Sequence, residues 1–362
     1  MRTDDDVPLS GLTTMRVGGP ARRLVTVDTT DELVDAVREI DDADEPLLVV
    51  GGGSNLVIAD EGFAGSVVRV ATGGITVESA GSSDVVMIRV AAGDVWDDVV
   101  VRAVAEGWSG VEALSGIPGS AGATPIQNVG AYGQEVAQTI AEVRVWDRGA
   151  QQVRTLSNAD CRFTYRHSLF KGEPRYVVLD VAFRLSLSRL SSPLAYADLA
   201  HALGVQAGKR VPLQDAREAV LGQRRQRGMV LDAGDHDTWS CGSFFTNPIM
   251  SAGSYAVLKD RAQARLGSTD GHEGHVGVPR FDTADGLVKT SAAWLIDRAG
   301  FGKGYGLPGP AALSTKHTLA VTNRGAASAA DVVELAREIR DGVQDAFGVS
   351  LVNEPVLVGL TL

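Results

Sequence analysis

The chain has 362 residues, enough for about two or three domains, and its 44% hydrophobic content is ordinary for a globular protein. A net charge of -11 argues against a general role in binding nucleic acid or membrane surfaces, and the two cysteines, Cys161 and Cys241, are too few for a disulfide framework or a zinc cluster. The acidic start is no secretory signal and no apolar run approaches the roughly 18 residues that span a bilayer, so we expect a cytoplasmic protein.

A β-α-β unit is the first pattern in the chain. Apolar runs predict strands at 24–27 and 47–50, and the helix between them begins at a capping box formed by Thr29 and Glu32. The second strand leads directly into the loop Gly51 to Leu56. The bare N–H groups of this loop favour phosphate binding. A plain glycine turn is the alternative, because the loop matches neither of the two common nucleotide-binding motifs.

Strands and helices then alternate along the rest of the chain. Strands are predicted at 66–70, 85–91, 142–146, 152–156, 176–187, 319–322 and 349–358. Helices are predicted at 95–106, 213–224, 254–265, 291–299 and 328–347. Asp94 and Ser328 are expected to be N-caps, and Gly107, Gly300 and Gly348 to end their helices. Two polar segments without periodicity are predicted to be a linker or lid and a loop insertion, at 229–238 and 267–286.

The stretch from Ser115 to Glu135 holds five glycines and two prolines, so it forms neither a regular helix nor a central strand. Glycine permits positive φ and a close approach of the backbone to other groups. We expect this bent, polar run to wrap a large ligand with several acceptors, such as a dinucleotide. An ordered loop without a ligand is the alternative. Together with the loop Gly51 to Leu56, it would suit a cofactor with two phosphates.

Three residues stand in contexts that suit chemistry. Arg166 lies between aromatic and polar neighbours, Ser243 lies between a glycine and two phenylalanines, and Glu354 lies near the C-terminus in an expected strand. Each has an ordinary alternative: a surface ion pair, a turn hydroxyl and an exposed strand carboxylate. The six histidines lack HxxxH spacing, so no metal site is expected, and the segment around Ser243 is no GxSxG elbow.

These segments together resemble the UDP-N-acetylenolpyruvoylglucosamine reductases, the MurB family of flavoenzymes. The matching segments follow the family's order over nearly the full length, at 14–19, 51–55, 115–135, 165–171, 242–248, 293–297 and 354–355. Among the departures, Cys241 stands where an alanine is common and Thr246 where a lysine is common, and 267–286 is extra length. These differences concern the pocket edge and the substrate contacts rather than the reaction.

The resemblance implies an α+β protein with an FAD-binding fold of the vanillyl-alcohol-oxidase type. The expected parts are two FAD-binding subdomains, a substrate-binding domain and a C-terminal strand, at 1–72, 73–230, 231–354 and 355–362. FAD is expected to bind without a covalent link to Gly51, Gly52, Gly53, Ser54, Asn55, Leu56, Ser115, Gly116, Ile117, Pro118, Gly119, Ser120, Gly122, Ala123, Gln127, Asn128, Gly130, Ala131 and Tyr132. Tyr196 matches a tyrosine that closes over the substrate in one branch of the family, and Asn247 and Lys289 are candidates for the uridine diphosphate.

The implied reaction is the NADPH-dependent reduction of the enolpyruvyl ether of UDP-N-acetylglucosamine to UDP-N-acetylmuramate, a step of peptidoglycan synthesis. NADPH reduces the flavin, and hydride from flavin N5 then adds to C3 of the enolpyruvyl group. Arg166 and Glu354 are expected beside the substrate carboxylate, where negative charge develops. Glu354 would need a raised pKa to assist an anion, and Ser243 would deliver the proton to C2 as general acid.

Two competing functions remain at this point. A flavin oxidase of the same broad fold explains both glycine loops but not the Ser243 and Glu354 segments together. A non-catalytic nucleotide-binding module is disfavoured by the presence of Arg166, Ser243 and Glu354. The expected partners are the enolpyruvyl sugar nucleotide and NADPH, with no nucleic acid, no membrane and a monomeric state.

Overall fold

The computed structural model describes residues 1–78, 84–267 and 277–362, so the central part of the predicted insertion 267–286 lies outside the described residues. Helices and strands are mixed along the chain, as the predicted α+β class requires. The chain forms two compact units. The first comprises 1–12, 20–53 and 62–231, and the second comprises 13–19, 54–61 and 232–362.

The first unit contains a four-stranded sheet in the order β1-β2-β5-β3. Its strands are β1 Arg2–Pro8, β2 Pro20–Val27, β3 Leu47–Val50 and β5 Phe63–Val70. Helix α1, Thr30–Asp42, begins as predicted at Thr29, whose hydroxyl accepts the Glu32 N–H, although the Glu32 carboxylate accepts from Asp28 N–H instead of completing the box. Strands β2, β3 and β5 run parallel, which the helical crossover between β2 and β3 permits.

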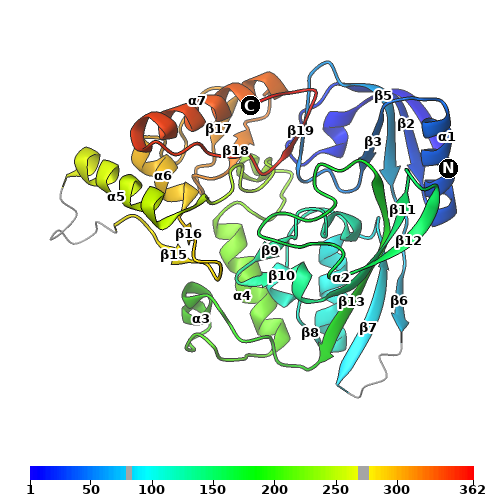
Figure 1. Ribbon diagram of the computed structural model, residues 1–362, viewed down its shortest axis with the longest axis horizontal. Coiled ribbons are helices and arrows are strands. Elements are labelled where there is room, and N and C mark those ends of the chain that lie inside the picture. The colour runs from blue at the N-terminus through cyan, green and yellow to red at the C-terminus, as the bar shows by residue number, and fades with distance from the viewer. Residues whose placement is uncertain (79–83, 268–276) are drawn as a thin grey trace. The chain divides into compact units, whose positions relative to one another are not determined.

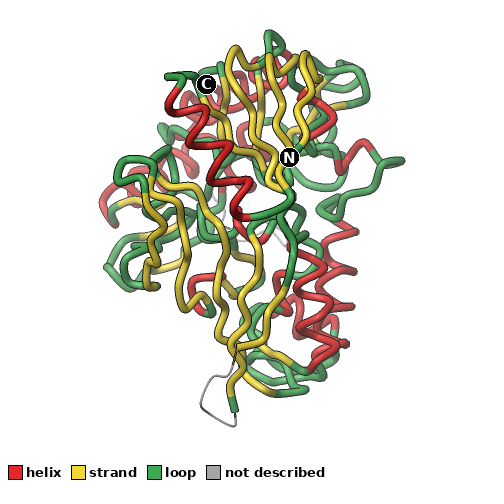
Figure 2. Tube along the Cα trace, turned by 90° about the vertical axis from the view of Figure 1, so that its right-hand side faces the viewer, coloured by secondary structure: helices red, strands yellow, loops and turns green. Residues whose placement is uncertain are grey.

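The first unit also contains a six-stranded sheet, in the order β12-β11-β13-β7-β6 with β8 beside β13. Its strands are β6 Ile75–Glu78, β7 Val85–Ala91, β8 Trp108–Ser109, β11 Ile140–Asp147, β12 Gln152–Ser157 and β13 Tyr176–Leu187. Neighbouring strands are antiparallel, and β7, β13 and β11 lie side by side as long twisted ribbons (Figure 1). Figure 2 shows the strands of the protein in yellow from a second direction. Strands β11 and β12 form the predicted hairpin.

Two helices of the first unit lie near the glycine-rich stretch. They are α2 Trp96–Glu106 and α4 Leu213–Gln226, and the short α3 Ala197–Ala202 packs against α4. The ring of Trp96 on α2 lies 5.5 Å from that of Phe183 on β13, so α2 covers one face of the sheet. The prediction that Asp94 caps α2 is wrong, because Val95 is the N-cap and the Asp94 carboxylate accepts from Gly74 N–H.

The second unit is built around α7, Ala329–Phe347, which packs against α5 Ala252–Leu266 and α6 Ala292–Ala299 (Figure 1). Its short strands are β14 Ile249–Met250, β15 Phe281–Asp282, β16 Val288–Lys289, β17 Ala311–Leu313, β18 Val321–Asn323, and the parallel pair β4 Leu56–Ile58 and β19 Val356–Val358. Ser328 forms the N-cap of α7 in a full capping box with Asp331, and Gly348 ends the helix, as predicted.

Three sequence predictions for the second unit need correction. The strand expected at 349–358 is confined to β19, because Pro355 ends the preceding segment and residues 352–354 make only an isolated bridge. Of the two alternatives for 229–238, the linker holds, because the segment crosses from the first unit to the second. The lid does not, because the buried Asp237 accepts from Thr315 and Arg324. The expected loop 267–286 contains strand β15.

Candidate functional site

A pocket in the first unit brings the two glycine-rich segments together. It has a volume of about 100 Å³. Its lining includes Gly51 from the first loop and Ser120, Gly122 and Ala123 from the second, together with Ile126. Apolar side chains complete the wall, namely Val49, Val70, Ala92, Phe170, Tyr176, Val177 and Val178. The pocket therefore has glycine backbone on one part of its wall and aliphatic and aromatic side chains on the remainder.

The two loops contact each other through bare backbone. A Cβ atom on Gly52 would lie 2.5 Å from Gly119 Cα in the other loop. Gly122 of the second loop packs just as closely on the chain after β7, where its Cβ atom would lie 2.4 Å from Ala92 Cβ. Such distances are far below van der Waals contact, so only glycine fits at these positions. The result is a cradle of glycine backbone beside an apolar wall, although the Gly122 N–H already donates to Ala92 O. Such a cradle suits a ligand that combines phosphates with flat rings. FAD has this chemistry, and the residues present fit it.

Several predicted cofactor residues have side chains that are already bonded within the protein. The buried Ser115 hydroxyl donates to Glu112 O at 2.7 Å. The buried Asn128 side chain donates to Glu135 and to Thr164 O and accepts from Ala137 N–H. These side chains shape the loop, and a ligand contact from either residue would have to come from the backbone.

The first glycine loop is divided between the two units. Gly51, Gly52 and Gly53 belong to the first unit, whereas Ser54, Asn55 and Leu56 belong to the second. In the second unit, Asn55 Nδ2 donates to Glu354 O at 3.3 Å, and Val356 N–H donates to Asn55 O at 2.9 Å. Asn55 thus fixes the backbone on both sides of the Glu354-Pro355 pair.

Ser243 and Glu354 come together in the second unit through backbone pairing. Glu354 N–H donates to Phe244 O at 2.8 Å, and Phe245 and Asn353 form an antiparallel bridge. Ser243 is half-buried, and Glu354 is only 9% exposed. The alternative of an exposed strand carboxylate is therefore wrong for Glu354. A buried carboxyl and a hydroxyl on paired segments are suited to handling a proton.

The residues flanking Ser243 are built into the core of the second unit. Phe244 and Phe245 are almost fully buried, with ring centroids 5.2 Å apart, so they anchor the segment. The Cys241 thiol donates to Leu56 O at 3.4 Å, and burial raises the pKa of this thiol to about 12. A neutral thiol is a poor nucleophile, so Cys241 is a packing residue.

Arg166 lies in a tight turn of the first unit. Thr164 and His167 exchange backbone hydrogen bonds across this turn, and Arg166 has a φ of 54°, which is unusual for a residue with a side chain. Its guanidinium donates to Gly130 O at 2.9 Å, and Lys171 Nζ donates to Arg166 O. Arg166 is thus attached to the glycine-rich stretch, which fixes the position of its charge.

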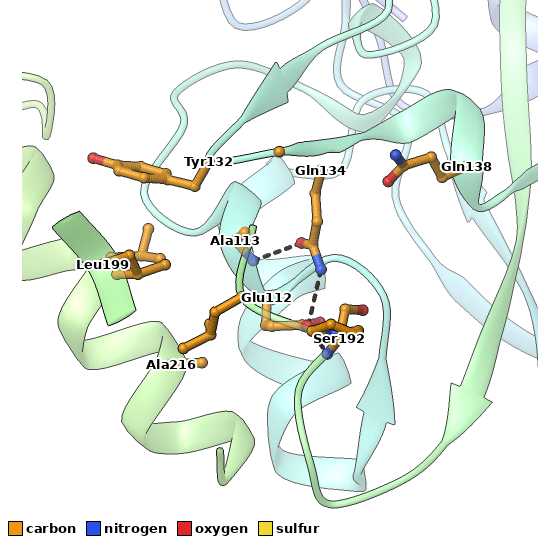
Figure 3. Close-up of a pocket in the computed structure, with 12 residues that line it drawn as sticks. Glu112, Ala113, Tyr132, Gln134, Gln138, Ser192, Leu199 and Ala216 are labelled. Carbon is orange, nitrogen blue, oxygen red and sulfur yellow. Dashed lines mark hydrogen bonds between the residues drawn. The ribbon is translucent and has the colours of Figure 1, made fainter. Parts of the chain in front are cut away.

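Tyr196 packs against Tyr132, which lines a second pocket of the first unit. Their ring centroids are 6.0 Å apart in an edge-to-face arrangement, and Tyr196 is 51% exposed. Figure 3 shows this pocket, of about 300 Å³, where Gln134 connects Ala113 N–H to the buried Glu112 carboxylate. Tyr132 lines this second pocket, and the pocket with the glycine wall is lined by other residues.

The two substrate candidates of the second unit have different surroundings. The Asn247 side chain accepts from Ala292 N–H at 3.0 Å, so it stabilises the start of α6. Lys289 lies on β16, paired with Ile249 and Phe281. Within the described ranges, no group of three or more His, Cys, Asp or Glu could hold a metal ion. No helix in the same ranges has the length and apolarity needed to cross a bilayer.

Comparison with known proteins first identifies the class of protein to which the chain belongs. The family model described as an FAD binding domain matches residues 21–156, which include the glycine pocket's loops. This match, together with the cradle that only glycine permits, defines the chain as a flavoprotein that binds FAD. The predicted fold class and cofactor are confirmed.

A second family model and the similar full-length proteins then identify the family of the chain. The family model for the C-terminal domain of UDP-N-acetylenolpyruvoylglucosamine reductase matches residues 234–358. Relatives of that name from Thermobifida fusca and Streptomyces coelicolor are 57% and 58% identical, covering 99% of this chain and 98% and 90% of their own lengths. The crystal structure of the Thermus caldophilus enzyme matches with a TM-score of 0.65 at 26% identity over 99% of both chains. The chain belongs to the UDP-N-acetylenolpyruvoylglucosamine reductase family, as predicted.

Sequence reasoning missed the apolar wall of the glycine pocket and two charged residues beside the glycine-rich stretch. Phe170, Tyr176 and Val178 stand in or near predicted strands, and their alternation gives no sign of a ligand. Asp97 and Arg217 form a bidentate ion pair across 120 residues of sequence. Only the amphipathic pattern of their helices hints that they face one another.

Proposed function

We propose that this protein is a UDP-N-acetylmuramate dehydrogenase, which reduces UDP-N-acetylglucosamine enolpyruvate with NADPH and thereby serves peptidoglycan precursor synthesis. The observation that carries the proposal is the pairing of the Ser243 and Glu354 segments in a chain that also has a cradle for FAD. FAD in that cradle would accept hydride from NADPH and supply it to C3 of the enolpyruvyl group. Family membership supports each part of this assignment.

Ser243 has the role of proton donor in this proposal. Hydride addition at C3 leaves negative charge on C2 and the substrate carboxylate, and a proton must reach C2 to complete the reduction. A half-buried hydroxyl on an anchored segment has the fixed position that general acid catalysis requires. Loss of the Ser243 proton leaves an alkoxide, so a proton must return to Ser243 before the next turnover.

Arg166 and Glu354 stabilise the developing charge. Arg166 presents a guanidinium that its bond to Gly130 O holds in place, and such a fixed cation favours a carboxylate as it becomes more negative. Glu354 is buried, and burial disfavours the charged form of a carboxyl. A protonated Glu354 would donate a hydrogen bond to the same anion.

The remaining contacts and the state of the protein are part of the same proposal. The backbone of the two glycine loops would hold FAD without a covalent link, and Tyr196, Asn247 and Lys289 would contact the sugar nucleotide. The FAD-binding part would comprise subdomains 1–72 and 73–230, with 231–354 as the substrate domain. Two buried free cysteines suit a reducing cytoplasm, and the net charge of -11 favours a monomer.

The test is NADPH consumption in the absence of oxygen. We expect NADPH oxidation beyond the one equivalent that reduces the flavin only when the enolpyruvyl sugar nucleotide is present, with one product formed for each further NADPH consumed. A flavin oxidase would show no such turnover without oxygen, and in air it would consume oxygen with an alcohol or sugar. A non-catalytic module would leave NADPH unchanged under both conditions, and either result would overturn the proposal.

Replacing Tyr196 with Phe should weaken binding of the sugar nucleotide. The change keeps the ring against Tyr132 but removes the hydroxyl, and one neutral hydrogen bond is worth about 0.5–1.5 kcal/mol, or about 3- to 10-fold in affinity. The measurement is the KM for the sugar nucleotide beside the rate of flavin reduction by NADPH, which should not change. An equal loss in both would show that Tyr196 has a structural role only.

A further inference from the structure

Gly116, at the entry of the glycine-rich stretch, is held from two sides. Its N–H donates to Asp97 Oδ1 at 2.6 Å, and its carbonyl accepts from Arg224 Nη2 at 3.3 Å. Its φ of 70° is in the left-handed region that favours glycine. The backbone of the predicted cofactor loop therefore begins from a point that two charged side chains fix.

The Asp97 carboxylate on α2 forms a bidentate ion pair with Arg217 on α4. The two nitrogens of the guanidinium lie 2.7 and 2.8 Å from the two carboxylate oxygens, and the Arg217 side chain is only 11% exposed. Burial alone would raise the pKa of Asp97, but Arg217 and the Gly116 N–H together bring it below its usual range. The carboxylate is therefore charged, and its charge is engaged by Arg217 in a strong bidentate pair.

Arg224, two turns further along α4, has no such counter-ion. Its Nη2 donates to the carbonyls of Gly116 and Met229, while its buried Nε has no hydrogen-bond partner within the described ranges. Burial lowers the pKa of Arg224 to about 10. Arg224 is half-buried, but its buried Nε without a hydrogen-bond partner is costly, so an anion that the protein binds is expected to reach it.

We propose that the Asp97–Arg217 pair is a positioning device for the cofactor loop, which holds Gly116 and keeps Arg224 available for an anionic group of bound FAD. The inference rests on the proposed function, because FAD is the anion considered. In this inference, Arg217 and Arg224 compete for the single carboxylate of Asp97. Asp97 and Arg224 bind the N–H and the carbonyl of the same residue, Gly116, so an Asp97 without Arg217 would turn to Arg224 and neutralise it.

The test compares the FAD affinity of a single variant, Arg217→Met, with that of a double variant that also carries Asp97→Asn. In Arg217→Met, Asp97 is released and pairs with Arg224, so FAD binding should weaken by about 10- to 100-fold, as expected for one lost charge-assisted contact. In Asp97→Asn with Arg217→Met, the amide oxygen still accepts from Gly116 N–H and no carboxylate competes. Affinity should then return to within about 3-fold of wild type. The readout is quenching of FAD fluorescence during titration into apoprotein.

A second readout distinguishes which anionic group Arg224 serves. If Arg224 contacts the diphosphate, Arg217→Met should lose the same affinity for oxidised and for reduced FAD, and the reduction potential of the bound flavin should stay constant. If it contacts the ring, which becomes negative on reduction, the reduced form should lose more, and the potential should fall by about 30 mV for each tenfold difference.

The controls separate positioning from folding. Arg144→Met removes a comparable contact to the buried Asp180, which keeps its bond to Arg89, so it should lower the melting temperature without changing FAD affinity. Arg217→Lys keeps a positive charge and gives an intermediate result if Arg217→Met does not fold. An Arg217→Met affinity equal to wild type, or a double variant as weak as the single, overturns the inference. A wild-type protein that binds no FAD overturns the proposed function instead.

Discussion

Ser243→Ala should be reduced by NADPH at nearly the wild-type rate, yet its flavin should be reoxidised by the enolpyruvyl substrate about 10²–10⁴-fold more slowly, the usual contribution of a general acid. The two halves of the cycle differ in what they require. Hydride transfer from NADPH needs no proton at the sugar, whereas reduction of the enolpyruvyl group leaves charge on C2. The measurement is stopped-flow flavin absorbance in each half-reaction.

Ser243→Cys provides the matched comparison, because it keeps a transferable proton at the same atom position. Part of the lost rate of reoxidation should return. The neighbouring Cys241 gives a further check, since it is buried and bonded to Leu56 O, and Cys241→Ala should leave both half-reactions unchanged. If Ser243→Ala slows reduction by NADPH as much as reoxidation, the serine holds the site together and is not the proton donor.

Gly52→Val should abolish FAD binding and yield colourless protein. A Cβ on Gly52 would lie 2.5 Å from Gly119 Cα and 2.8 Å from Gly119 C, both backbone atoms, so the two loops would have to separate. Their separation would open the wall of the pocket that Gly51 and Ser120 line. The measurement is the flavin absorbance of the purified variant relative to its protein absorbance, with circular dichroism as a check on folding.

Gly222→Ala is the control for this substitution. Gly222 lies within α4 and has no atom within 4 Å of a Cβ position, so alanine should fit and raise stability by about 1 kcal/mol through helix propensity. Its flavin content should equal that of wild type. A folded Gly52→Val protein with full flavin occupancy would contradict the placement of FAD in the pocket that the two loops line.

Local signals predicted most of the secondary structure, and the failures have physical causes. Ser328 caps its helix as predicted, because its hydroxyl accepts the N–H of Asp331 in the first turn. Asp94 does not, since a loop N–H from Gly74 competes for its carboxylate. The strand expected at 349–358 failed because hydrophobic residues also occur in segments that pair through isolated bridges.

The candidate site, like the secondary structure, was predictable from the sequence only in part. Glycine runs are visible in sequence, and their close approach explains why Gly52 and Gly119 lack side chains. The burial of Glu354 and the ion pair of Asp97 with Arg217 depend on contacts between distant parts of the chain. No local sequence pattern encodes such contacts. From residue type alone, Glu354 could equally be an exposed strand carboxylate, and no role could be predicted for Arg217.

The absorption spectrum of the purified protein, taken without oxygen in three steps, tests the central claim most directly. We expect a bound-flavin spectrum that NADPH bleaches and that the enolpyruvyl sugar nucleotide restores, with one equivalent of product formed. Flavin that stays bleached after the sugar nucleotide is added, or protein that carries no flavin, would contradict the assignment of this chain as a UDP-N-acetylmuramate dehydrogenase.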